Sequence, residues 1–165
     1  MVLTETDLER IGSEIQTKED QLVFLEDLHA ASERLYERGA STEGLRGEVS
    51  DKFLKVVQGL ERDKLLPLEP AGQEAFFKKL RDYVEKLPIV RVTLAFSPRR
   101  ELVGKIRSYF SAEGGGLPPI LDVYVRDEIG GGIILEHAGV YRDLSLSKGL
   151  DNLVHDKEFL AGLLA

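Results

Sequence analysis

The sequence of 165 residues contains no cysteine, no tryptophan and a single methionine. The absence of cysteine excludes disulfides, thiolate zinc sites, iron–sulfur clusters and thiol catalysis, because each of these needs a cysteine sulfur. It is also compatible with a reducing cytoplasm. Aromatic residues make up only 7% of the chain, whereas charged residues reach 31% and hydrophobic residues 42%. This balance is typical of a soluble, folded protein and not of a disordered one.

Long apolar runs and an excess of positive charge are also missing. No run approaches the roughly 20 apolar residues that a helix needs to cross a bilayer. The opening residues, MVLTETDLER, are acidic where a secretory signal peptide has a basic region and an apolar core. The net charge of -7 is unfavourable for nucleic acid, whose phosphates attract clustered lysine and arginine. We therefore expect a cytoplasmic protein that binds no nucleic acid and reaches a membrane only through a partner.

Residues 1–88 are predicted to form a helical bundle domain. The segment 17–20, TKED, resembles a capping box, in which a hydroxyl and an acid three residues later satisfy free N–H groups at a helix start. Apolar residues then recur every three or four positions, as on the buried face of a helix. Gly39 separates the first such face from the second, and Pro67 and Pro70 separate the second from the third. The three faces consist of Phe24, Leu28, Ala31 and Leu35; Phe53, Leu54, Val57 and Leu60; and Phe76, Leu80, Tyr83, Val84 and Leu87.

At Pro88 the periodicity changes, and residues 89–165 are predicted to form a small α/β domain with a C-terminal helix. Runs of β-branched residues and alternation of apolar with polar residues predict strands. Glycine and proline between 114 and 119 predict a flexible turn. The fold class is therefore α+β, an N-terminal helical bundle followed by a small C-terminal β-α-β-β-α domain. The expected elements are a strand at 89–96, a helix from 97 to 110, a strand at 121–126, a hairpin of 133–135 and 140–145 turning at 138–139, and a closing helix from 150 to 163.

Three consecutive glycines, Gly130, Gly131 and Gly132, raise the question of a phosphate-binding loop. A P-loop continues into Gly-Lys-Ser/Thr at the start of a helix, and a dinucleotide-binding loop also enters a helix after its last glycine. Here the glycines lead into the apolar strand 133–135, and Gly104-Lys105 lies inside a predicted helix. We therefore interpret Gly131 and Gly132 as residues that let the chain pass close to a neighbouring element. No cofactor is expected.

The histidines give no sign of a metal site. His29, His137 and His155 are far apart, and none has a second ligand at a spacing typical of metal binding.

A catalytic site is not indicated either. Ser145, His137 and Asp143 could be combined into a triad, but no nucleophile elbow accompanies them. Asp143 is more simply interpreted as making local hydrogen bonds at a strand end, with Ser145 or Ser147 capping the last helix. The sequence therefore predicts a protein that is not an enzyme, with no catalytic, cofactor-binding or metal-binding residues.

The C-terminal segment resembles the signature region of the ATP synthase delta subunit, whose mitochondrial counterpart is called OSCP. That region has Gly-Gly, an apolar strand, a turn, a second strand ending in Asp-x-Ser, and a helix with leucines three apart. The residues that correspond are Gly131, Gly132, Asp143, Ser145, Leu150 and Leu153. The strand 90–95, VRVTLA, is similar to the family's Val-x-Val-Thr-x-Ala strand, and the segments Phe53-Leu54 and Leu65-Leu66-Pro67 resemble its last bundle helices.

The resemblance implies a short and divergent member of this family, a non-catalytic stator component of a rotary F-type ATP synthase. Such a component links the alpha subunits of the catalytic head to the b subunit of the peripheral stalk during proton-driven ATP synthesis. The helical half would bind the alpha-subunit N-termini, and the other half the b subunit. It would be peripheral on the inner face of the cell membrane, as part of the complex. Candidates for partner contact are Leu160, Leu163 and Leu164, for which packing onto the sheet is an equal alternative.

Two alternatives stay open at the level of the sequence. One is a small nucleotide-binding protein or enzyme built on the same α/β unit. The other is the peripheral-stalk E subunit of a V/A-type ATPase, which also joins helices to a C-terminal α/β domain. That subunit begins with a long continuous helix, whereas Gly39, Pro67 and Pro70 interrupt the helical part of this chain.

Overall fold

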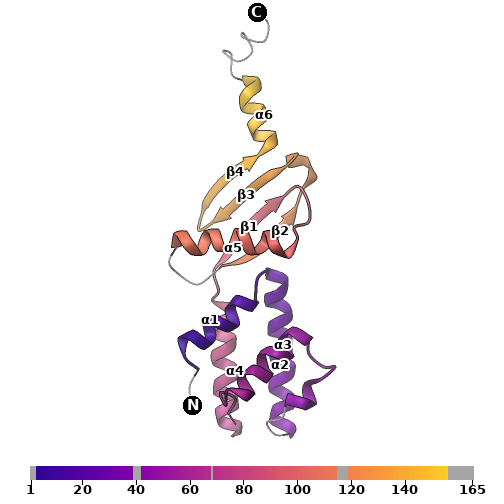
Figure 1. The fold of residues 1–165 in the computed structure, drawn as a ribbon, viewed down its shortest axis with the longest axis vertical. Helices are drawn as coiled ribbons and strands as arrows, with labels where there is room; N and C mark the ends of the chain where they lie inside the picture. The colour runs from indigo at the N-terminus through magenta and orange to yellow at the C-terminus, as the bar shows by residue number, and fades with distance from the viewer. Residues whose placement is uncertain (1–2, 39–41, 68, 115–118, 156–165) are drawn as a thin grey trace, which may run out of the picture.

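The computed structural model describes residues 3–38, 42–67, 69–114 and 119–155, and its fold is α+β (Figure 1). A helical part lies at one end of an elongated molecule, a sheet with one helix on it lies in the middle, and a last helix leads away from the sheet. The helical part consists of α1 (Glu5–Glu14), α2 (Lys18–Arg38), the 3-10 helix η1 (Thr42–Leu45), α3 (Asp51–Arg62) and α4 (Pro70–Glu85). The remainder consists of β1 (Ile89–Leu94), α5 (Arg100–Gly114), β2 (Ile120–Val125), the 3-10 helix η2 (Asp127–Ile129), β3 (Gly132–His137), β4 (Val140–Ser145) and α6 (Leu146–His155).

The starts of the helices follow from local side-chain chemistry. The Thr17 hydroxyl accepts a hydrogen bond from the N–H of Asp20 at 3.1 Å, and the Asp20 carboxylate accepts one from the N–H of Thr17 at 3.1 Å. The predicted capping box of α2 is therefore confirmed. Thr4 and Asp7 form a second capping box at α1, which was not among the elements predicted from the sequence. Pro70 occupies the first turn of α4, where its missing N–H costs no hydrogen bond.

The predicted apolar faces form the core of the helical part. Leu28 and Ala31 of α2 are completely buried, and the rings of Phe24 and Phe53 pack edge to face with centroids 5.0 Å apart. Leu54 and Tyr83 are only partly buried, and the side chain of Leu35 lies outside the part that the structure describes. The buried cluster comprises Leu3, Leu8, Ile11, Ile15, Phe24, Leu28, Ala31, Leu45, Phe53, Val57, Leu60, Leu66, Phe76, Phe77, Leu80, Val84, Leu87 and Ile120.

The sheet has four strands in the order β2-β1-β3-β4. β1 and β2 are parallel and α5 is the crossover between them, whereas β3 is antiparallel to both β1 and β4. Ala138 and Gly139 connect β3 to β4 with φ angles of 49° and 78°. Positive φ at both central residues is the conformation of a tight turn that matches the twist of a hairpin. The predicted turn position is thus confirmed, while the segment 115–118 of the other predicted turn lies outside the described residues.

One face of the sheet packs against α5. Val90, Val92 and Leu94 alternate with exposed or half-buried neighbours along β1, and they contact Val103 of α5 in a second buried cluster. Ile120, at the start of β2, belongs to the cluster of the helical part instead. Apart from Ile120, all residues of the first cluster precede Pro88 in the sequence and all residues of the second cluster follow it. The assignment of 1–88 and 89–165 to separate domains stays a prediction.

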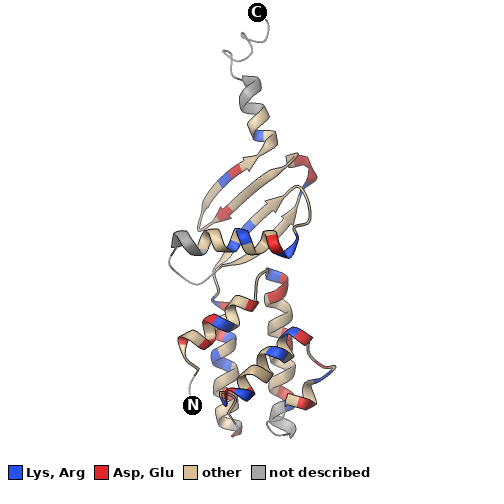
Figure 2. Cartoon of the chain, viewed as in Figure 1, with Lys and Arg blue, Asp and Glu red and all other residues tan. Residues whose placement is uncertain are grey.

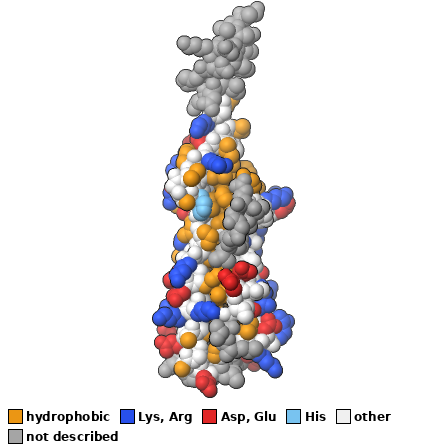
Figure 3. All heavy atoms as spheres, turned by 90° about the vertical axis from the view of Figure 1, so that its left-hand side faces the viewer, with side chains coloured by type: hydrophobic (Ala, Val, Ile, Leu, Met, Phe, Trp, Pro, Cys, Tyr) orange, Lys and Arg blue, Asp and Glu red, His pale blue; other side chains and the backbone are white. Residues whose placement is uncertain are grey.

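The helical part and the sheet differ in the charge of their surfaces. Acidic and basic residues are interspersed along α1 to α4, and fewer of them occur along β3 and β4 (Figure 2). On the face shown in Figure 3, hydrophobic side chains gather over the sheet region, whereas the helical part is largely charged. Within the described ranges, no helix combines the length and the apolar character needed to cross a membrane.

Candidate functional site

The triple glycine forms a bend by which the chain enters β3. Gly130, Gly131 and Gly132 have φ angles of 68°, 138° and 77°, a region that residues with a Cβ rarely adopt. A Cβ at Gly132 would lie 2.3 Å from the carbonyl oxygen of Leu144, and a Cβ at Gly131 would lie 2.7 Å from a methyl carbon of Leu146. The N–H of Leu146 donates to the carbonyl of Gly131 at 3.1 Å. These glycines therefore allow the bend to pass directly against the start of α6, as expected for backbone geometry.

Asp143 and Ser145 complete this junction from the side of β4. The Asp143 carboxylate accepts a hydrogen bond from the N–H of Ser145 at 3.0 Å, and the Ser145 hydroxyl accepts one from the N–H of Lys148 at 3.3 Å. Hydrogen bonds from the hydroxyl and the N–H of Ser145 hold the pKa of Asp143 below its usual range. Ser145 thus caps α6, as predicted, while the Ser147 hydroxyl donates to the carbonyl of Glu128 at 3.0 Å.

Exposed apolar side chains lie along β4 and α6, the two elements that meet at the junction. Val140, Leu144, Leu146 and Leu150 are each more than half exposed, with exposed fractions of 57%, 62%, 59% and 62%. We call these four residues the β4–α6 surface. Val140 and Leu144 lie on the same face of β4, and Leu146 and Leu150 are one helical turn apart on α6. Four large apolar side chains left in water at one end of the chain are typical of a protein-binding surface.

Only one residue of this surface, Leu150, was singled out from the sequence. The side chain of Leu153 lies outside the described part of the chain, as do Leu160, Leu163 and Leu164, so their predicted roles stay predictions. Val140 and Leu144 were missed because an apolar residue in a strand is normally assigned to the core, and Leu146 because the closing helix was expected to begin only at residue 150. The signal that could have found them is their setting, since β4 is an edge strand and most of its side chains are exposed.

The histidines and the hypothetical triad do not converge. His29 is exposed on α2 and lies 3.7 Å from Glu33, and the side chain of His155 lies outside the described part. His137 Nδ1 lies 3.1 Å from the carbonyl oxygen of Ile89. His137 pairs with Val140 at one end of the hairpin, whereas Ser145 pairs with Gly132 at the other end. Among the described residues, no group of three histidine or acidic side chains could hold a metal ion.

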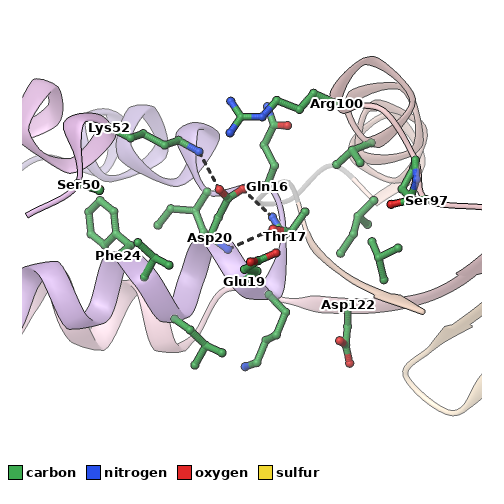
Figure 4. A pocket seen from close by; sticks show the side chains of 18 of the residues that line it. Gln16, Thr17, Glu19, Asp20, Phe24, Ser50, Lys52, Ser97, Arg100 and Asp122 are labelled. Carbon is green, nitrogen blue, oxygen red and sulfur yellow. Dashed lines mark hydrogen bonds and ion pairs between the residues drawn. The ribbon is translucent and has the colours of Figure 1, made fainter. Parts of the chain in front are cut away.

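A hollow of about 770 Å³ lies where the helical part meets the sheet (Figure 4). Its lining includes the N-terminus of α2, Lys52 of α3, Arg100 at the start of α5 and Asp122 of β2. Lys52 lies 3.1 Å from the Asp20 carboxylate, which also caps α2. Asp122 lies 3.8 Å from Arg91, outside the hollow. Since its charged groups are largely engaged in pairs and caps, the hollow resembles a junction between two parts more than a catalytic cleft.

Comparison with known proteins assigns the chain to no family. No protein-family model matches the sequence, and no curated protein matches it either.

Proposed function

We propose that this protein is a non-catalytic stator component of a rotary F-type ATP synthase, similar to the delta subunit. Its role is mechanical. It would join the alpha subunits of the catalytic head to the b subunit of the peripheral stalk, so that the head cannot turn with the rotor. Its association with the inner face of the membrane would then depend on the complex.

The β4–α6 surface is the observation that carries this proposal. Leu144 and Leu146 of this surface lie beside Gly131, Gly132, Asp143 and Ser145, the residues on which the resemblance to the delta subunit is based. A stator contact must have a slow dissociation rate, and buried apolar area with well-packed anchors is what slows dissociation. We assign the β4–α6 surface to the b subunit.

A second contact is needed on the helical part of the molecule. Leu22 and Val23 of α2 are 53% and 41% exposed, and both line the hollow beside the sheet. An amphipathic segment such as an alpha-subunit N-terminus binds through apolar residues on one helical face. Two apolar surfaces, one on the helical part and one beyond the sheet, suit a protein that connects two partners.

The proposal is tested by binding of purified alpha and b subunits from the same organism. We expect the b subunit to bind the wild-type chain, and Leu150→Asp to weaken this binding by at least about 30-fold, the effect of losing an anchor worth about 2 kcal/mol. Gly149→Asp, an exposed change on the same helix that meets no neighbouring atoms, is the matched control for one added negative charge. It should weaken b binding much less.

Two results would contradict the proposal. One is that neither subunit binds the wild-type chain at micromolar concentrations. The other is that Mg-ATP raises the thermal unfolding midpoint, since only a ligand that binds the folded state does so. The second result would favour the nucleotide-binding alternative.

A further inference from the structure

A buried arginine joins the helical part to the sheet part. Arg107 lies in the middle of α5, and only 6% of its surface is exposed. Its Nε donates to the carbonyl of Pro119 at 2.8 Å, its Nη1 to the carbonyl of Ser13 at 3.1 Å, and its Nη2 to the carbonyl of Gly12 at 3.3 Å. Each nitrogen of the guanidinium thus has a separate acceptor. The rigid fork of an arginine can hold three segments in one fixed arrangement, which a single ammonium group cannot.

The acceptors belong to different parts of the chain. Gly12 and Ser13 lie in the last turn of α1, where the carbonyl groups lack the regular helical partners, although that of Gly12 also accepts from the N–H of the C-cap residue Ile15 at 3.2 Å. No basic residue of α1 itself occupies that turn, so Arg107 supplies from α5 the positive charge that a helix C-terminus favours. Pro119 immediately precedes β2. The guanidinium therefore links α1 of the helical part to α5 and to the start of β2.

Two backbone contacts lie directly beside this arginine. The N–H of Leu121 donates to the carbonyl of Gln16 at 2.9 Å, and Thr17 forms a parallel bridge with Leu121. The segment between α1 and α2 thus runs along the outer edge of β2. These contacts involve the same short stretch, residues 12–17, to which Arg107 is bonded. They fix its position along β2, whereas the arginine fixes α1 against α5.

The electrostatic setting of Arg107 is consistent with a fixed, charged side chain. Burial lowers the pKa of Arg107, and attraction to Asp20 acts in the opposite direction. A buried charge is costly unless hydrogen bonds replace the lost water. Removing the guanidinium would leave the carbonyls of Gly12, Ser13 and Pro119 without these donors in a closed junction.

We propose that Arg107 is the positioning residue that locks the helical part and the sheet part into one rigid body. Without it, each part keeps its own buried cluster, but the angle between the two varies. A rigid connection is what a mechanical link between two partners needs. The proposal does not depend on that function, because it concerns the free chain alone.

Distances between spin labels measure this rigidity directly, and the absence of cysteine makes labelling simple. Labels at Lys55→Cys on α3 and Glu128→Cys on η2, both exposed, report on the two parts. We expect a narrow distance distribution in the otherwise unaltered chain and a distribution at least about twice as wide with Arg107→Met, because the donors to three carbonyls in two segments are lost. Arg107→Lys keeps the charge but not the fork, so it should give an intermediate width.

Two controls separate a loosened joint from general loss of structure. Labels at Lys55→Cys and Asp82→Cys lie within the helical part, and their distribution should be unaffected by Arg107→Met. Arg100→Met, at the exposed start of the same helix, removes the same charge and should leave both distributions narrow. An unchanged Lys55–Glu128 distribution in Arg107→Met would overturn the proposal. If that variant does not fold, Arg107→Lys decides, since a width equal to that of the unaltered chain would overturn it as well.

Discussion

Gly132 and Gly139 have almost the same backbone conformation in very different surroundings. Their φ angles are 77° and 78°. A Cβ at Gly132 would meet the backbone of Leu144 at 2.3 Å, whereas a Cβ at Gly139 would meet nothing within 4 Å. Alanine at either position therefore imposes a similar conformational strain, but only at Gly132 does it also collide with the backbone of β4. Comparing the two positions therefore separates the cost of a positive φ angle from the cost of a steric clash with a neighbouring strand.

We predict that Gly139→Ala lowers the free energy of unfolding by about 1–2 kcal/mol, the cost of a left-handed conformation with a Cβ. Gly132→Ala should lower it by at least about 1 kcal/mol more, because the hairpin must shift to make room. Urea denaturation of both variants measures the difference. Equal losses would mean that the close approach of Gly132 to β4 does not contribute.

At the scale of single elements, several hydrogen bonds fix the start of α2. The Asp20 carboxylate accepts hydrogen bonds from the N–H groups of Gln16 and Thr17 at 3.0 Å and 3.1 Å, and from Lys52 of α3 at 3.1 Å. Burial raises the pKa of Asp20, but these hydrogen bonds and the charge of Lys52 outweigh it, so that the pKa lies below the usual 3.8. The ionised form of Asp20 is therefore preferred in the folded state.

This preference makes the stability contributed by Asp20 depend on pH. A carboxyl group whose pKa is lower in the folded than in the unfolded chain stabilises the fold above its unfolded pKa and stops doing so as the pH falls through its folded pKa. We predict that Asp20→Asn costs about 1–2 kcal/mol at neutral pH. The difference from wild type should shrink as the pH falls below 3.8.

Urea denaturation at several pH values measures this difference. Asp82→Asn, an exposed change on α4, is the control for the loss of one negative charge. A cost of Asp20→Asn that stays constant down to low pH would show that the carboxylate charge does not contribute to the cap.

The elements themselves could largely be predicted from the sequence, because each depends on neighbouring residues. The capping box at Thr17, the break at Pro67 and Pro70, and the alternation along β1 are local patterns with a direct structural cause. α1 was not identified as a separate helix, although Thr4 and Asp7 have the same spacing as the box that was recognised. Its ten residues are short, and their apolar members, Leu8 and Ile11, are too few to show a clear periodicity.

Contacts between the two parts could not be predicted, because they have no local pattern. Arg107 donates to backbone carbonyls, and any residue provides a carbonyl, so the sequence gives no sign of its partners. Likewise, Val140 and Leu144 of the β4–α6 surface lie on the last strand of the sheet, and strand order is a property of the whole fold. Gly131, Gly132, Asp143 and Ser145 were singled out by a resemblance, whereas their contacts required the structure.

At the scale of the whole molecule, Ile120 couples the two parts through the core. It is the first residue of β2, yet it is completely buried in the cluster of the helical part. Val90 of β1, which is equally buried, belongs to the cluster of the sheet part. The two residues are therefore a matched pair for asking whether the parts depend on each other.

We predict that Ile120→Ala lowers the free energy of unfolding by about 2–5 kcal/mol, the usual cost of such a truncation in a core. Amide hydrogen exchange should become faster in α2 and α4 as well as in β1 and β2, because the cavity lies in the shared cluster. Val90→Ala should accelerate exchange mainly in the sheet. If Ile120→Ala left the exchange of α2 and α4 unaltered, the two parts would be energetically independent.

The strand-like contact of Thr17 with Leu121 bears on how this chain can be divided. Residue 88, where the periodicity changes, is the obvious place to cut. In a fragment that begins there, the side chain of Ile120 would be exposed to solvent. The outer edge of β2 would also be unpaired, and an unpaired edge strand can pair with other chains and cause aggregation. The half with the sheet therefore needs residues 12–17 from the other half as a cover. The two fragments should therefore be co-expressed, so that they associate before either one aggregates.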